Sequence, residues 1–141
     1  MINEAIWIID DDTDDHDLVK DVCRELGLKN KLVFLTGATQ ALEKLKKISV
    51  APFIIICDVN LPQIDGFSLR EKMLADPSKK MHSVPFIFWS TSASEQQITK
   101  AYALSAHGFF IKEHSYQELK ASFAGIINYW RKSKMPEKAG K

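Results

Sequence analysis

The 141-residue sequence has no long hydrophobic run, little net charge and only two cysteines. No stretch approaches the roughly 18 apolar residues of a membrane-spanning helix, and residues 1–9 lack the basic segment that begins a secretory signal peptide. The formal net charge of +1 gives the whole chain no strong attraction to nucleic acid or to membranes. These absences predict a cytoplasmic protein.

Cysteine is scarce, and the two residues present show no spacing typical of metal ligands. Cys57 lies in an apolar run and Cys23 lies in a pattern with helical spacing. We interpret both as reduced core residues, as expected in a cytosolic protein.

The small net charge hides an uneven distribution. The first seventeen residues contain seven acidic residues and no Lys or Arg, which indicates either a cation site or a solvated face. The last eleven contain five basic residues and only one acidic residue, Glu137. We therefore expect one domain over residues 1–132, followed by a basic, disordered tail over residues 133–141.

Five short apolar runs, rich in Ile, Val, Phe and Trp, occur along the chain. This composition is typical of strands buried on both faces of a sheet. The predicted strands are Ala5–Ile9, Leu32–Leu35, Phe53–Cys57, Pro85–Trp89 and Gly108–Ile111.

A segment with helical spacing of apolar residues follows each run. The predicted helices carry the stripes Leu18, Val19, Val22, Cys23 and Leu26, ending at Gly27; Ala41, Leu42, Leu45 and Ile48; residues 65–75; Ile98, Ala101, Tyr102 and Ser105; and Leu119, Phe123, Ile126, Ile127 and Trp130. Strands that alternate with helices predict a doubly wound (βα)5 domain of the α/β class. Its parallel sheet is expected to be covered by helices on both faces.

Polar residues follow four of the five predicted strands. The positions are Asp10–Asp12, Asp58, Ser90–Ser92 and Lys112. Ligands of open parallel sheets bind beyond the carboxyl ends of the strands, at the point where strand order reverses. We therefore expect these side chains to meet at one edge of the sheet.

Carboxylates, a lysine and a hydroxyl form a chemically coherent set at such an edge. Crowded carboxylates repel one another, which raises their pKa values unless a cation lies between them. Mg²⁺ accepts a few carboxylate oxygens and keeps other positions for water and phosphate. A carboxylate can itself accept a phosphoryl group, whose charge a metal and a lysine would stabilise.

Over residues 4–132 the sequence resembles the receiver domain of response regulators. Four pieces carry the resemblance: Ile-Ile-Asp10-Asp11-Asp12, the D-x-N-x-P-x-x-D-G segment over residues 58–66, Phe-Trp-Ser90-Thr-Ser, and Gly108-Phe-Phe-Ile-Lys112. The resemblance implies a flavodoxin-like fold with strand order 2-1-3-4-5. It also implies a phosphoacceptor switch, with at most slow self-dephosphorylation rather than enzymatic turnover.

The resemblance assigns roles to the matching residues. Asp58 would be the phosphoacceptor; Asp10, Asp11, Asp58 and the backbone carbonyl of Asn60 would hold Mg²⁺; Ser90 and Lys112 would contact the phosphoryl group; and Ser90 and Phe109 would form the switch. The donor would be a phosphohistidine of a histidine kinase or phosphotransfer protein. The fourth helix, fifth strand and fifth helix would face an unknown downstream protein.

Some assignments have alternatives. The pair Asp11–Asp12 could replace Asp10–Asp11, although the spacing to Gly27 favours the latter. Asp12, Asp14 and Asp15 also suit the first turn of a helix, where acids interact favourably with the helix dipole. All four histidines are interpreted as surface or loop residues.

One residue departs from the family pattern. Glu113 stands where receiver domains usually have proline after the lysine, so a trans peptide bond is expected there. The charge of Glu113 beside Lys112 would also weaken the hold of the lysine on a phosphoryl group.

Two other functions compete with the switch. A metal-dependent phosphohydrolase would need a second carboxylate two residues beyond the nucleophile, where this chain has Asn60. A receiver-like interaction module that is not phosphorylated is favoured only by Glu113. Too little chain follows residue 132 for a DNA-binding module.

Overall fold

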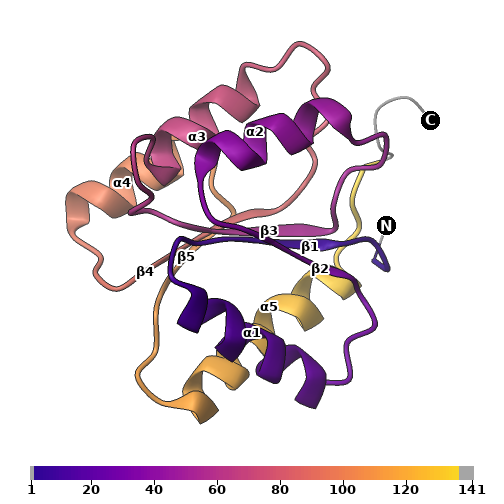
Figure 1. Cartoon of the computed structure of the whole chain (residues 1–141), viewed down its shortest axis with the longest axis vertical. Coiled ribbons are helices and arrows are strands. Elements are labelled where there is room, and N and C mark those ends of the chain that lie inside the picture. Colours follow the sequence, from indigo (N-terminus) through magenta and orange to yellow (C-terminus); the bar gives the residue numbers. More distant parts are fainter. Residues whose placement is uncertain (1, 137–141) are drawn as a thin grey trace.

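The computed structural model describes residues 2–136, which form a five-stranded parallel sheet with helices on both faces (Figure 1). The elements are β1 (Ile6–Ile9), α1 (Thr13–Glu25), β2 (Leu32–Leu35), α2 (Ala38–Lys47), β3 (Ile54–Asp58), α3 (Gly66–Leu74), β4 (Phe86–Ser90), α4 (Glu95–Ala103), β5 (Gly108–Ile111) and α5 (Tyr116–Lys132). The strand order is β2-β1-β3-β4-β5. The predicted doubly wound (βα)5 fold is therefore confirmed.

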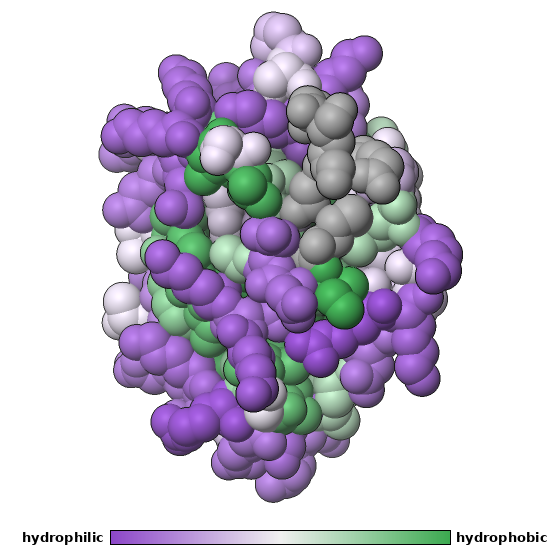
Figure 2. All heavy atoms as spheres, turned by 90° about the vertical axis from the view of Figure 1, so that its right-hand side faces the viewer, coloured by the Kyte–Doolittle hydropathy of each residue, from purple (hydrophilic) through white to green (hydrophobic). Residues whose placement is uncertain are grey.

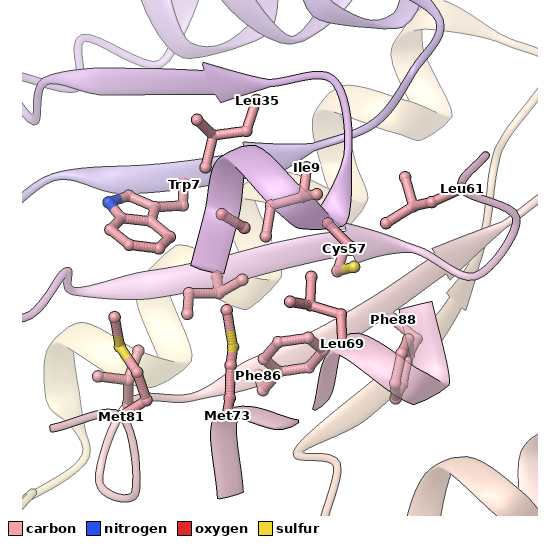
Figure 3. Close-up of a cluster of buried hydrophobic side chains, with 14 of the residues drawn as sticks. Trp7, Ile9, Leu35, Cys57, Leu61, Leu69, Met73, Met81, Phe86 and Phe88 are labelled. Atoms are coloured by element: carbon pink, nitrogen blue, oxygen red, sulfur yellow. The ribbon is translucent and has the colours of Figure 1, made fainter. Parts of the chain in front are cut away.

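The two faces of the sheet have separate hydrophobic cores. Successive side chains of a strand point to opposite faces, so Ile6 and Ile8 of β1 pack toward α1 and α5, whereas Trp7 and Ile9 pack toward α2 and α3. Figure 3 shows the second core, in which Trp7 and Ile9 lie near residues of β3 and α3. The central strands are thus buried on both faces, as predicted.

The edge strands and three predicted helix positions differ from the prediction. Most residues of β2 are only partly buried, and β5 exposes Phe110 and Ile111, because each edge strand has a neighbour on one side only. Leu18 and Tyr102, expected in the apolar stripes of α1 and α4, are 41% and 53% exposed. Ser105, also expected in the stripe of α4, is exposed and lies beyond the end of that helix. Each of these helices therefore buries fewer residues than its periodicity predicted.

Side-chain caps decide where four of the helices begin. Asp12, Asp65, Ser94 and Ser115 each accept a hydrogen bond from a backbone N–H in the first turn of α1, α3, α4 and α5. Ser94 forms a reciprocal capping box with Gln97. Asp65 thus caps α3, and the observed helix Gly66–Leu74 agrees with the helix predicted over residues 65–75.

Both cysteines are buried and unpaired. Burial raises the pKa of the Cys23 thiol to about 11.

No helix within residues 2–136 is both long enough and apolar enough to cross a membrane. The face of the molecule that Figure 2 shows is mostly hydrophilic, with hydrophobic residues in narrow strips.

Helix α5 ends at Lys132, at the predicted end of the domain. Of the predicted tail, residues 137–141 lie outside the described residues. Among residues 133–136, Met135 is partly buried and packs against the core beside α5. The disorder expected for residues 133–141 stays a prediction.

A buried arginine ties α3 to the end of α4. Arg70 is 1% exposed, and its guanidinium donates hydrogen bonds to the backbone carbonyls of Leu104 (3.0 Å) and Ser105 (2.9 Å). The guanidinium also lies over the ring of Phe86, 4.9 Å from its centroid. Burial lowers the pKa of Arg70 to about 10, so the side chain stays charged at neutral pH.

We expect Arg70→Ala to lower the free energy of unfolding by about 3 kcal/mol, because the change removes the donor of two partly buried hydrogen bonds and a fully buried, packed side chain. Urea unfolding followed by circular dichroism measures this loss. Lys72→Ala, at an exposed position of the same helix, is the control and should change stability by less than about 0.5 kcal/mol. Equal effects of the two substitutions would contradict a structural role for Arg70.

Candidate functional site

The predicted polar residues meet at the carboxyl edge of the sheet. Asp10 follows β1, Asp58 and Ser90 are the last residues of β3 and β4, and Lys112 directly follows β5. The helix after β1 covers one face of the sheet and the helix after β3 covers the other. The strand order therefore reverses between these two neighbouring strands, which is where an open α/β sheet can hold a ligand.

The ammonium of Lys112 lies among three carboxylates. Its Nζ is 2.9 Å from Oδ2 of Asp58, 2.7 Å from Oδ2 of Asp15 and 2.9 Å from Oδ2 of Asp10. It donates hydrogen bonds to Asp58 and Asp15, whereas the contact with Asp10 is an ion pair without hydrogen-bond geometry. The lysine side chain is only 11% exposed, so solvent screens these interactions weakly.

The carboxylates of Asp10, Asp11 and Asp58 converge. They place one oxygen each within 4.8 Å of one another, with Asp10 and Asp58 buried and Asp11 exposed. Oδ2 of Asp10 is buried and, apart from its ion pair with Lys112, makes no hydrogen bond to any atom of residues 2–136. Three converging hard oxygens, one of them without a hydrogen bond, fit a divalent cation such as Mg²⁺. Asp12 lies outside this group because it caps α1.

Burial and neighbouring charges raise the pKa values of both Asp10 and Lys112. Burial raises the pKa of Asp10 to about 7, although the ion pair with Lys112 and the backbone hydrogen bond from Asp12 lower it in part. Burial alone would lower the pKa of Lys112, but its hydrogen bonds to Asp15 and Asp58 and its ion pair with Asp10 outweigh burial and raise the pKa above its ordinary value. The site thus holds a firmly charged ammonium beside a carboxyl that is costly to ionise.

The loop after β3 holds Asp58 in place through its backbone. The N–H of Asn60 donates to Oδ1 of Asp58 at 3.0 Å, which leaves Oδ2 for Lys112. Gly66 lies directly beside the same residue, since a Cβ atom at Gly66 would be 2.3 Å from the carbonyl oxygen of Asp58. Only glycine fits this approach of α3 to the end of β3.

Ser90 ends β4 next to this cluster, and Phe109 lies on the neighbouring strand β5. Ser90 is fully buried, its hydroxyl accepts a weak hydrogen bond from the N–H of Ser92 at 3.4 Å, and its carbonyl accepts one from the N–H of Lys112 at 2.7 Å. Phe109 of β5 is partly buried, with its ring centroid 6.2 Å from that of Phe88. The main chain thus ties Ser90 directly to Lys112.

Two residues of α1 belong to the site that sequence reasoning did not place there. Asp15 binds Lys112, and the ring of His16 is buried, with Nε2 2.6 Å from the carbonyl oxygen of Asp10. The prediction that all four histidines lie on the surface was therefore wrong for His16. A signal was present, because Asp15 and His16 lie four and three residues before Val19, a buried residue on the same face of the helix.

Glu113 does not join the carboxylates around Lys112. The Lys112–Glu113 peptide bond is trans, as expected. The Glu113 side chain is exposed and shares a hydrogen bond with Glu118, which raises its pKa. The charge of Glu113 is therefore directed toward α5 rather than toward the site.

The sequence is similar to those of known proteins. The family model described as the response regulator receiver domain matches residues 6–124. Chemotaxis protein CheY-3 of Vibrio cholerae is 29% identical over 125 residues, which cover 89% of this chain and 92% of the relative.

Solved structures share the fold. The phosphorylated cyanobacterial phytochrome response regulator RcpA aligns with a TM-score of 0.85 at 22% identity, covering 96% of this chain and 99% of that one. The Mn²⁺-bound form of response regulator Rcp1 aligns with a TM-score of 0.81 at 23% identity, covering 94% and 99%.

We expect Asp10→Asn to stabilise the metal-free protein at pH 8 by about 2 kcal/mol, because it removes a buried charge. A raised carboxyl pKa means that the folded state favours the protonated acid. The contribution of the protonated acid to the free energy of unfolding is complete below pH 4 and is lost as the pH rises through about 7. The free energy of unfolding of Asp10→Asn should therefore exceed that of the native chain by an amount that grows between pH 5 and pH 8. Urea unfolding in the presence of EDTA measures this difference. Asp14→Asn, an exposed control, should show no such trend, and a variant less stable than the native chain at pH 8 would contradict the expectation.

Proposed function

The chain belongs to the response regulator receiver family, and on that premise we propose that it is a stand-alone switch that accepts a phosphoryl group on Asp58. Receiver domains are phosphoacceptor switches of two-component systems. The observation that carries the assignment is the carboxylate of Asp58 at the end of β3, 2.9 Å from the ammonium of Lys112 and beside two further carboxylates.

The phosphoryl donor is a phosphohistidine of a histidine kinase or phosphotransfer protein. A carboxylate oxygen of Asp58 forms a bond to phosphorus while the phosphorus–nitrogen bond of the donor breaks, and the electron pair stays on the imidazole nitrogen, which then takes a proton. Lys112 and the hydroxyl of Ser90 bind the oxygens of the transferred group as a point charge and a donor. Ser90 ends β4, which is the neighbour of β3, and Lys112 follows β5, the next strand of the sheet.

Asp10, Asp11, Asp58 and the backbone carbonyl of Asn60 are proposed to hold Mg²⁺. The buried Oδ2 of Asp10, which makes no hydrogen bond within residues 2–136, supports this assignment. When bound, Mg²⁺ supplies positive charge that offsets the carboxylates and the incoming phosphoryl oxygens. A divalent cation is also named for the related Rcp1 structure.

The response is proposed to pass through Ser90 and Phe109. When the hydroxyl of Ser90 turns toward the phosphoryl group it gives up its 3.4 Å contact with the N–H of Ser92, and space opens for the ring of Phe109 to turn inward. Phe109 belongs to β5, so the change reaches the surface of α4, β5 and α5. A downstream protein is proposed to bind that surface, on which Tyr102, Phe110 and Tyr129 are exposed.

Incubation with acetyl phosphate and Mg²⁺ should add one phosphoryl group to the chain, measured by intact-mass spectrometry. Asp58→Asn should abolish the mass increase, because the amide is not a nucleophile toward phosphorus. Asp14→Asn, which removes an exposed acid near the site, should be modified like the native chain. EDTA should suppress the modification in every case.

The alternatives give different outcomes in the same experiment. Continuous release of inorganic phosphate without a stable phosphorylated species would indicate a phosphohydrolase. An unchanged mass together with no phosphate release would indicate an interaction module that is not phosphorylated. Modification that persists in Asp58→Asn would reject Asp58 as the acceptor.

The fluorescence of Trp89 should report on the site. The ammonium of Lys112 lies 4.9 Å from the centroid of the Trp89 ring, and Mg²⁺ or a phosphoryl group on Asp58 changes the charge around that ammonium. We expect tryptophan emission to change on addition of Mg²⁺ and again on phosphorylation. Trp89→Phe should lose both responses and Trp130→Phe should keep them; a flat signal from the native chain at saturation would contradict this expectation.

A further inference from the structure

Asp15 is a third carboxylate on Lys112, supplied by the first turn of α1. Its Oδ2 lies 2.7 Å from Nζ, which is closer than the carboxylate of Asp58 or Asp10. The Asp15 side chain is 17% exposed, so this contact is largely shielded from water. Its neighbour Asp14 lies in the same turn but is exposed.

The turn that carries Asp15 is fixed from two sides. Asp12 caps α1 by accepting a hydrogen bond from the N–H of Asp14, and Nε2 of His16 lies 2.6 Å from the carbonyl oxygen of Asp10 at the end of β1. The backbone of Asp15 is therefore held beside the site. A change in the side-chain torsions of Asp15 or of Lys112 can therefore separate the two groups without moving α1.

A phosphoryl group on Asp58 would need the same ammonium. It brings a charge of about −1.5 to −2 and three strong acceptor oxygens, whereas Lys112 has three N–H donors, two of which already bind Asp15 and Asp58. The carboxylate of Asp15 must then share the ammonium or give it up. In both cases it also repels the phosphoryl oxygens.

We propose that Asp15 competes with the phosphoryl group for Lys112 and thereby weakens the phosphorylated state. Asp15 is a positioning residue, because it acts through Lys112 rather than on the reacting atoms. This inference rests on the proposed roles of Asp58 and Lys112. Through Asp15, the first turn of α1 favours the unphosphorylated state of the chain.

The test measures the affinity for beryllofluoride, which binds a carboxylate as a phosphoryl mimic, at saturating Mg²⁺. Removing a charge-assisted hydrogen bond that opposes binding should make Asp15→Asn bind about tenfold more tightly than the native chain. Asp14→Asn, which removes the same charge from the same helical turn, should stay within about twofold because exposed charges are screened. Mg²⁺ affinity, titrated separately for each variant, shows that the metal is saturating.

A third variant separates competition from disturbed folding. Asp15→Glu keeps the charge within reach of Lys112 and should restore affinity toward the native value, whereas general damage to α1 would affect Asn and Glu variants alike. If Asp15→Asn binds no more tightly than Asp14→Asn, the inference is overturned. If the native chain itself binds no beryllofluoride, the proposed function of Asp58 fails instead.

Discussion

The organisation of the site depends on the ion pairs between Lys112 and the carboxylates at the edge of the sheet. Asp10, Asp15 and Asp58 come from three different elements, and Lys112 follows a fourth. Without an interior cation, three acids at this distance would repel one another strongly. The ammonium of Lys112 therefore offsets the repulsion among these carboxylates in the folded chain. An anionic group that binds Lys112 must compete with the carboxylates already paired with it.

Much of this arrangement is predictable from sequence, because parallel strands place the residues that follow them at a common edge. Alternation of strand and helix predicted the fold, and the positions of Asp58, Ser90 and Lys112 followed from it. Asp15 and His16 were not predicted as site residues, since acids near a helix start have an adequate local explanation. Their true partners, Lys112 and the Asp10 carbonyl, become neighbours only when α1 packs against the sheet.

The same edge shows how a binding site differs from the rest of the core. Elsewhere the sheet buries aliphatic and aromatic residues, but here it buries Asp10, Asp58 and Ser90. Burying a carboxylate costs free energy unless it is paired, and Asp10 is paired only in part. A bound cation would supply the missing partner, so stability and cation occupancy are coupled at this edge.

Arg70 has a mechanical consequence for the proposed response. Its two hydrogen bonds fasten the carboxyl end of α4 to α3, the helix whose first residue touches Asp58. The amino end of α4 follows the short segment after Ser90 and has no such fastening within the described part of the chain. We therefore expect any displacement of α4 that starts near Ser90 to be smallest at the carboxyl end of the helix, where Arg70 holds it.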